Sequence, residues 1–318
     1  MNVIDWVLKY DVFIQYLVKR DLLELNDDKL QDLKQRILTE GYGLELLRKQ
    51  DLKTNTWGGG VYSPKYISTH YTLLEFCQLG APLKSERFIK AIKLLFDVMW
   101  NNKGKVKPYR HQDLCIVAMM IRIACEASYR DKKIYEMVDY ILDHQMSDGG
   151  WNCAWERKPH PRQSSLHTTL SVLEAFNMYK QSEYNYRIDE INESVFEGVE
   201  YMLTKKLFRS VRTNQVIHKD MLSFPFPYNW RYDILRALTV MAKLKIPYDN
   251  RMQEGLTYLI NKLDVYGRIK ADKKPPSLHH FRYTKTNQLC PYNTFRVLRV
   301  LKYYLRNDYD IYIKKAIE

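Results

Sequence analysis

Hydrophobic residues recur at intervals of three and four along nearly the whole chain, which is the pattern of amphipathic helices. The first such stripe contains Ile4, Val7, Leu8 and Ile14. The spacing predicts helices over residues 3–23, 28–38, 43–49, 68–79, 85–100, 111–128, 131–144, 165–179, 188–207, 230–244, 250–263 and 292–305, and then a short terminal helix. Since few or no strands are expected, the pattern predicts an all-α chain.

The composition favours the same fold class. Of 318 residues, 46% are hydrophobic, whereas only 12 are Gly and 11 are Pro, which is typical of long helices and not of many short strands. We therefore expect one domain over residues 1–318, with helices of residues 1–50 packed on the remainder. Residues 264–289 lack a helical stripe and are a candidate lid over a cavity or a basic surface arm.

Two stretches of the chain look like copies of one unit. Gly58, Gly59 and Gly60 follow Trp57, and Gly149 and Gly150 precede Trp151; a polar segment and a helix follow in both. An alignment of the two copies matches residues 74–75 with residues 173–174, both Leu-Glu, and weaker echoes begin at residues 228 and 291. Repeated helix pairs bury their apolar faces only against neighbours, and the small number of repeats favours a closed ring. The prediction is an α/α toroid whose inner helices begin around a central cavity.

Aromatic side chains just before or at the starts of the inner helices are candidates for the wall of this cavity. The candidates named here are His111, Trp151, Trp230 and Tyr232. Packing in the core or against a loop is the alternative for each of them.

The Gly-Gly-Trp turn of residues 148–153 and its counterpart at residues 57–60 resemble the repeats of squalene cyclases and of protein prenyltransferase β subunits, from about Trp57 to the C-terminus. The chain is also similar to bacterial proteins labelled squalene-cyclase-like or prenyltransferase-like. The resemblance implies an α/α toroid and an enzyme that acts on an isoprenoid or a similarly apolar substrate. Neither the Asp-x-Asp-Asp motif of squalene cyclases nor an Asp-Asp-x-x-Asp magnesium motif is present.

The resemblance to prenyltransferases also implies a zinc site. Asp113 and Cys115 lie at the start of one helix and His167 at the start of the next repeat's helix, in the order of that family's ligands. A carboxylate, a thiolate and an imidazole suit zinc and leave a fourth position open. Cys153 is a candidate for that position, and His111 is a further possible ligand.

The residue types leave other roles open for this group. Without zinc, Asp113 and His167 are a candidate acid–base pair. A helix cap for Asp113 and core packing for the cysteines are the structural alternatives. Asp148 and Asp233, which lie beside the repeat turns, complete the candidate catalytic carboxylates.

The chain carries a formal net charge of +13 and has a sequence pI near 9.3. Arg209 and Arg212 belong to a basic cluster between two helices and are candidate phosphate contacts, with a solvated helix end as the alternative. We expect no nucleic-acid partner, because Lys and Arg are scattered and no recognised binding motif is visible. The first helix is a candidate for peripheral membrane contact.

Five cysteines, an odd number, are widely spaced, and the N-terminus lacks a secretory n-region. These features predict a cytoplasmic chain with reduced thiols, and membrane association through the first helix is the alternative left open. The apolar stretch over residues 114–120 ends before Arg122 and is too short to span a bilayer. The competing functional class is a non-catalytic toroid that binds an apolar ligand or a protein partner, and the sequence leaves the protein partner open.

Overall fold

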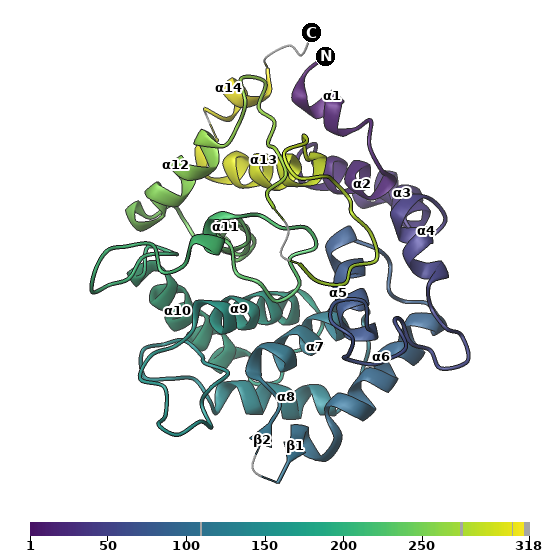
Figure 1. Ribbon diagram of the computed structural model, residues 1–318, viewed down its shortest axis with the longest axis vertical. Coiled ribbons are helices and arrows are strands. Elements are labelled where there is room, and N and C mark those ends of the chain that lie inside the picture. The colour runs from purple at the N-terminus through teal and green to yellow at the C-terminus, as the bar shows by residue number, and fades with distance from the viewer. Residues whose placement is uncertain (109, 274–275, 307, 315–318) are drawn as a thin grey trace.

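The computed structural model describes residues 1–108, 110–273, 276–306 and 308–314. Within these residues the chain is all-α apart from one antiparallel pair of short strands, β1 (Lys105–Lys107) and β2 (Arg110–His111). The α-helices, shown in Figure 1, are α1 (Val3–Val7), α2 (Val12–Asp21), α3 (Asp27–Arg36), α4 (Gly41–Arg48), α5 (Thr69–Leu79), α6 (Glu86–Met99), α7 (Leu114–Glu126), α8 (Lys133–Leu142), α9 (Leu166–Gln181), α10 (Ile188–Thr204), α11 (Ile234–Lys243), α12 (Gln253–Asn261), α13 (Pro291–Leu305) and α14 (Tyr309–Ile313).

Alternate helices pack against one another in a continuous succession. Helix α2 contacts α5, α5 contacts α7, α7 contacts α9, α9 contacts α11, α11 contacts α13, and α13 returns to α2. The helices between them, α6, α8, α10 and α12, each pack against the helix that precedes them. Figure 1 shows the first set around the middle of the molecule and the second set at its periphery.

The hydrophobic pattern explains which helices lie inside. Every residue of α5 is buried, and so are most residues of α7 from Leu114 to Cys125. Helix α6 instead has a buried stripe on one face, formed by Phe88, Ala91, Ile92, Leu95, Phe96 and Met99. A helix that is apolar on all sides is surrounded by protein, whereas one with a single stripe has a solvent face.

Three predicted helices are corrected by the structure. The helix predicted from residue 230 begins at Ile234. The predicted helix over residues 3–23 is two helices, because Asp11 caps α2: its carboxylate accepts the backbone N–H of Phe13 at 3.1 Å and that of Tyr42 at 3.0 Å. The helix predicted from residue 111 begins at Leu114. His111 lies in β2, where the Glu156 carboxylate accepts its backbone N–H at 2.9 Å.

The two glycine-marked turns have the same hydrogen bonds. In the first, the backbone N–H of Trp57 donates to Thr69 Oγ1 at 3.1 Å, and the indole donates to the Leu46 carbonyl at 2.8 Å. In the second, the backbone N–H of Trp151 donates to Thr169 Oγ1 at 3.0 Å, and its indole donates to the carbonyl of Ile141 at 2.8 Å. Each tryptophan thus joins an outer helix to the start of the next inner helix.

These hydrogen bonds fix the register of the two copies. Thr69 is equivalent to Thr169, and Phe76 is likewise equivalent to Phe176, since each phenylalanine ring packs edge-on against the tryptophan of its turn. The alignment of residues 74–75 with residues 173–174 is therefore wrong by one position. Glu174 corresponds to Leu74, so the first copy has no carboxylate at that place.

Residues 278 and 280, within the segment over residues 264–289, contact α5 and the chain before it. The backbone N–H of Tyr66 donates to the Leu278 carbonyl at 3.2 Å, and His280 Nε2 lies 2.8 Å from Thr72 Oγ1. In Figure 1 the yellow-green chain that precedes α13 crosses the view towards α5. Residues 274 and 275 of the candidate lid lie outside the described residues.

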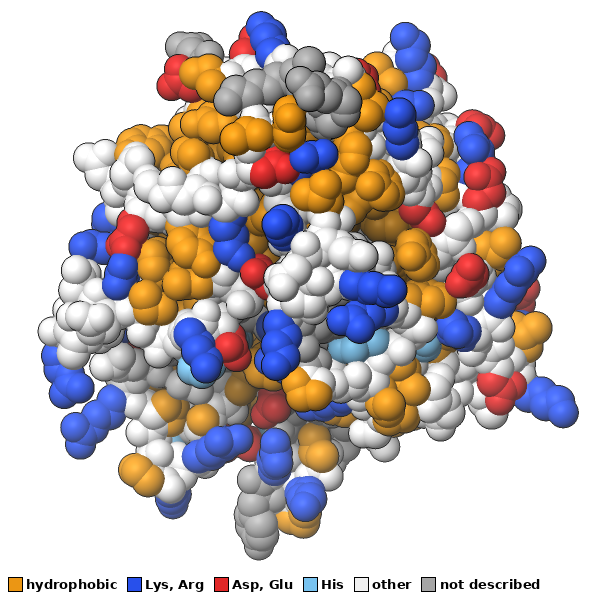
Figure 2. Space-filling view, turned by 45° about the horizontal axis from the view of Figure 1, so that its top comes forward, with side chains coloured by type: hydrophobic (Ala, Val, Ile, Leu, Met, Phe, Trp, Pro, Cys, Tyr) orange, Lys and Arg blue, Asp and Glu red, His pale blue; other side chains and the backbone are white. Residues whose placement is uncertain are grey.

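Two further findings concern the surface. Among the described residues, no helix is both long enough and apolar enough to cross a bilayer. Lys and Arg side chains are spread over the face shown in Figure 2, between hydrophobic and uncharged ones, and do not gather in one patch there.

Candidate active site

A pocket of about 330 Å³ brings together residues that are distant in the sequence. We call it the thiol pocket, and it lies at the starts of α7 and α9. Asp113, Cys115, Cys153, His167 and Trp230, all singled out from the sequence, line it. The rest of its wall is formed by Tyr62, Lys65, Tyr71, Ile116, Met119, Asn152, Ala154, Arg157, Ser165 and Thr168.

The sulfur of Cys153 accepts several hydrogen bonds. The backbone N–H of Cys115, in the first turn of α7, and the hydroxyl of Thr168 both lie 3.3 Å from Cys153 Sγ. The hydrogen bond from the Cys115 thiol, together with these two donors, lowers the pKa of Cys153 despite its burial, and the same contact raises the pKa of Cys115. Donors at a helix N-terminus favour a thiolate. Cys153 is therefore the more nucleophilic thiol of the pair.

The imidazole of His167 is held by the backbone that leads into α11. The Tyr232 backbone N–H donates to His167 Nδ1 at 3.1 Å, and the Trp230 ring lies 5.3 Å from the imidazole. Burial and the nearby Arg236 and Arg231 lower the pKa of His167 to about 4. At neutral pH the ring is uncharged and Nδ1 accepts, so Nε2 carries the proton. His167 can therefore offer Nε2–H as a hydrogen-bond donor to a molecule in the pocket.

The predicted zinc ligands lie around one pocket, but their hydrogen bonds do not fit a zinc centre. Because His167 Nδ1 accepts from a backbone N–H, neither ring nitrogen has a free lone pair. Across the described ranges, no three His, Cys, Asp or Glu side chains are grouped closely enough to hold a metal ion. Zinc binding stays a prediction of the sequence, and no step below depends on it.

Asp113 is the N-cap residue of α7, and its side chain forms no cap hydrogen bond. Its carboxylate lies 3.6 Å from the guanidinium of Arg110, and the side chain is 31% exposed. Asp113 thus faces the thiol pocket from a solvated edge, where it can contact a ligand.

Other candidates from the sequence lie elsewhere. Trp151 is fully buried between helices, where its indole caps α8, so it packs in the core and does not line the thiol pocket. His111 is paired with Glu156 through Nδ1. Tyr232 is buried and does not line the thiol pocket, but it contacts His167 both through its backbone N–H and through its ring, which packs edge-on against the imidazole at 5.8 Å.

Asp233 is a buried helix cap. One of its carboxylate oxygens accepts the backbone N–H of Arg236 at 2.6 Å and lies 3.6 Å from the Arg296 guanidinium. Burial raises its pKa. Because Asp233 does not line the thiol pocket, its place in the structure is that of a cap for α11.

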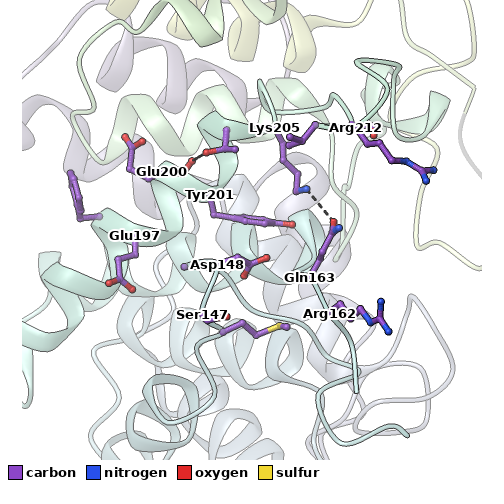
Figure 3. Close-up of a pocket in the computed structure, with 15 residues that line it drawn as sticks. Ser147, Asp148, Arg162, Gln163, Glu197, Glu200, Tyr201, Lys205 and Arg212 are labelled. Carbon is purple, nitrogen blue, oxygen red and sulfur yellow. Dashed lines mark hydrogen bonds between the residues drawn. The ribbon is translucent and has the colours of Figure 1, made fainter. Parts of the chain in front are cut away.

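Asp148 and Arg212 line a different, open pocket of about 1020 Å³, shown in Figure 3. The Asp148 carboxylate accepts the backbone N–H of Ser164 at 2.9 Å and so ties the turn to the chain before α9. Arg212 extends from the rim, away from Asp148, in Figure 3. Arg209 is bound by the Glu254 carboxylate and does not line this pocket.

Several residues of the thiol pocket were not found from the sequence. Thr168 follows His167 and positions Cys153, and the hydroxyls of Tyr62 and Tyr71 lie 3.1 Å apart in the wall. Lys65 and Arg157 add two cations. Thr168 and Tyr71 lie near the starts of inner helices, the position that the repeat pattern marks, whereas Lys65 and Arg157 lie in loops without a periodic signal.

Neither protein-family models nor curated proteins nor solved structures match this chain. The resemblance to squalene cyclases and prenyltransferases therefore rests on the residues of the sequence alone.

Proposed function

We propose that the chain is an α/α toroid enzyme that binds an isoprenoid or a similarly apolar substrate in the thiol pocket and attacks it with Cys153. The toroid is supported by the succession of contacts from α2 through α13 and back to α2. It is also supported by the two turns that join an outer helix to the next inner helix in the same way.

The observation that carries the function is the position of Cys153. Its sulfur receives the N–H of Cys115 and the hydroxyl of Thr168 inside a pocket with aromatic walls. An activated thiol near apolar surface suits attack on an apolar electrophile. The pocket volume of about 330 Å³ lies at the lower end of the range for small-molecule sites, so a short substrate chain is favoured.

An allylic diphosphate fits the charges of the pocket. The Cys153 thiolate attacks the allylic carbon, a C–S bond forms, the C–O bond breaks, and diphosphate leaves with the bonding electrons. Lys65 and Arg157 line the same pocket and would stabilise the leaving anion. The Nε2–H of His167 is a further donor. The thioether is then an intermediate or a stable adduct.

The experiment is capture of this adduct. We would incubate the protein with an allylic C5 or C10 diphosphate and locate any mass increase by peptide mass spectrometry. An adduct on Cys153 is expected; it should disappear in Cys153→Ser and slow in Thr168→Val, which removes a donor to the sulfur. The matched control Cys77→Ser removes a buried thiol outside the pocket and should retain the adduct. Modification of all cysteines alike, or none, would reject the proposal.

The competing class is a protein that binds an apolar ligand without reacting. Its support is the same pocket, and the capture experiment separates the two classes. Saturable binding of an isoprenoid alcohol, with neither adduct nor turnover from the diphosphate, would favour the binding protein. Loss of that binding in His167→Ala would still place the ligand at this pocket.

A further inference from the structure

A second, strongly basic region lies between the inner helices. It contains a cavity of about 70 Å³, which we call the arginine chamber. Seven Lys and Arg side chains line it, against two carboxylates, Glu126 and Glu174. The cations are Arg20, Lys34, Arg122, Arg236, Lys243, Arg296 and Arg299.

The charges in the chamber are only partly compensated. The Glu174 carboxylate lies 2.8 Å from both Arg122 and Arg236, so one negative charge faces two positive ones. Among the residues that the structure describes, the carboxylate paired with Arg296 is the more distant Asp233, at 3.6 Å, and Arg296 also donates to Asn293 Oδ1 at 3.2 Å. Arg20 and Arg299 share the carboxylate of Asp21. Buried charges without partners are costly, and a bound counter-ion is one way to remove that cost.

Unused hydrogen-bonding groups surround the same space. In the described part of the chain, no partner is found for Arg122 Nε, Arg236 Nε or the Thr239 hydroxyl, although all three atoms are buried. Arg122 and Arg236 are 4% and 1% exposed, and both line the chamber, as does Thr239. Buried donors are rarely left without an acceptor, so these groups indicate that a bound ligand supplies acceptor atoms in this space.

Lys243, on the last turn of α11, adds to this argument. Cations near helix C-termini usually compensate free carbonyls, as Lys302 does by donating to the Leu22 carbonyl at 2.8 Å. Within the described residues, no hydrogen bond or ion pair reaches Lys243. Burial and the neighbouring arginines lower its pKa to about 8. The ammonium group of Lys243 therefore lies near other positively charged side chains and has no compensating partner among the described residues.

The chamber opens onto a wider cavity of about 680 Å³, which we call the vestibule. Arg20, Thr239, Lys243 and Arg299 line both spaces. A chamber of about 70 Å³ has the volume of about two water molecules, which suits one tetrahedral oxyanion. The vestibule is large enough for the remainder of a small molecule.

We propose that the arginine chamber and the vestibule form a binding site for a phosphate-bearing small molecule, with one phosphate group in the chamber against Arg122, Thr239 and Lys243. A second phosphate or another substituent extends into the vestibule towards Arg20 and Arg299. Neither space shares a lining residue with the thiol pocket, so the proposed site stands independently of the proposed function of that pocket.

The test is titration calorimetry with inorganic phosphate and with pyrophosphate, at constant ionic strength. Binding of both anions is expected, with pyrophosphate the tighter because its second phosphate reaches the vestibule. Lys243→Gln and Thr239→Val should each weaken binding, Lys243→Gln by about tenfold or more, since each removes a contact to a charged ligand. Lys180→Gln is the matched control: it removes an exposed cation that lines neither space and should keep the affinity within about twofold.

A second readout distinguishes loss of the site from loss of folding. In phosphate-free buffer, Lys243→Gln should raise the melting temperature, because it removes an uncompensated cation, while weakening the response to phosphate. No binding of either anion up to about 10 mM would overturn the proposal. The proposal would also be overturned if Lys243→Gln and Thr239→Val both left the anion affinity unchanged. Equal affinity for phosphate and pyrophosphate would show that the vestibule is not part of the site.

Discussion

Glu174 is the carboxylate that pairs with two buried arginines between the inner helices. It is 5% exposed, accepts the hydroxyl of Tyr228 at 3.0 Å, and lies 2.8 Å from both Arg122 and Arg236. Glu174→Gln keeps the size and shape of the side chain but removes its charge. The two guanidinium groups then remain buried without a counter-charge.

The expected cost is large. Burial raises the pKa of Glu174, but Arg122 and Arg236 outweigh that effect and hold the pKa at about 2. Relative to an ordinary value near 4.5, this shift corresponds to about 3 kcal/mol. Breaking a buried ion pair costs about 3–5 kcal/mol, so we expect the free energy of unfolding to fall by about that amount at pH 7.

The pH dependence has a defined sign. A carboxylate whose pKa is lowered on folding stabilises the protein above the pKa of the unfolded chain, and this contribution is lost as the pH falls through the folded value. The free energy of unfolding of wild type should therefore fall by about 3 kcal/mol between pH 4.5 and pH 2 through Glu174. Glu174→Gln lacks this contribution and should not show the fall. The difference between the two proteins narrows across this window.

Urea unfolding of both proteins at pH 7, 5, 4 and 3.5 measures this difference. The matched control is Glu200→Gln, which breaks an exposed pair with Arg251 at 2.9 Å and should cost less than about 1 kcal/mol. A Glu174→Gln effect as small as that of the control would refute the reasoning. So would a difference that stays constant with pH.

Three further predictions concern packing, titration and metal content. Gly198→Ala in α10 should destabilise the protein by about 1–3 kcal/mol, because the new Cβ would lie 2.9 Å from the Trp151 ring. In Gly255→Ala, in α12, the new Cβ meets nothing closer than 3.5 Å, so this variant should stabilise the protein by about 0.5–1 kcal/mol. Chemical denaturation compares the two variants. Because the pKa of His167 is lowered on folding, the free energy of unfolding of wild type should fall by on the order of 2 kcal/mol as the pH falls from 6.5 to about 4. His167→Asn retains an acceptor for the Tyr232 N–H and should not show this loss. Melting curves of both proteins across that pH range test the prediction. Elemental analysis of protein purified without chelator tests the zinc prediction: one equivalent would support it and would show that the hydrogen bonds of His167 rearrange to admit the metal, whereas less than about a tenth of an equivalent would reject it.

The all-α class and the order of the helices were predictable from the sequence, because apolar spacing reports which face of a helix is buried. The helix starts were less so. Asp11 and His111 are held by Tyr42 and Glu156, which are distant in the sequence. A start fixed by such a contact has no local signal.

The thiol pocket was predictable in part. The repeat pattern placed Cys115 and His167 at the starts of inner helices, and both line the pocket with Cys153. The direction of each polar atom was not predictable, because it depends on the chain around it. The zinc interpretation needs a free nitrogen on His167, but the Tyr232 backbone N–H occupies Nδ1, and only the packing of α11 against α9 reveals that contact.

The chain before α11 separates the thiol pocket from the arginine chamber. Tyr228 extends across the interior: its backbone N–H donates to Gln78 at 3.1 Å and its hydroxyl reaches Glu174. Two residues later, Trp230 forms part of the thiol pocket, while Tyr228 itself lines the arginine chamber. A short stretch of chain thus forms a wall of both spaces. The two spaces therefore differ in character, with a thiol among aromatic side chains in one and an excess of positive charge in the other.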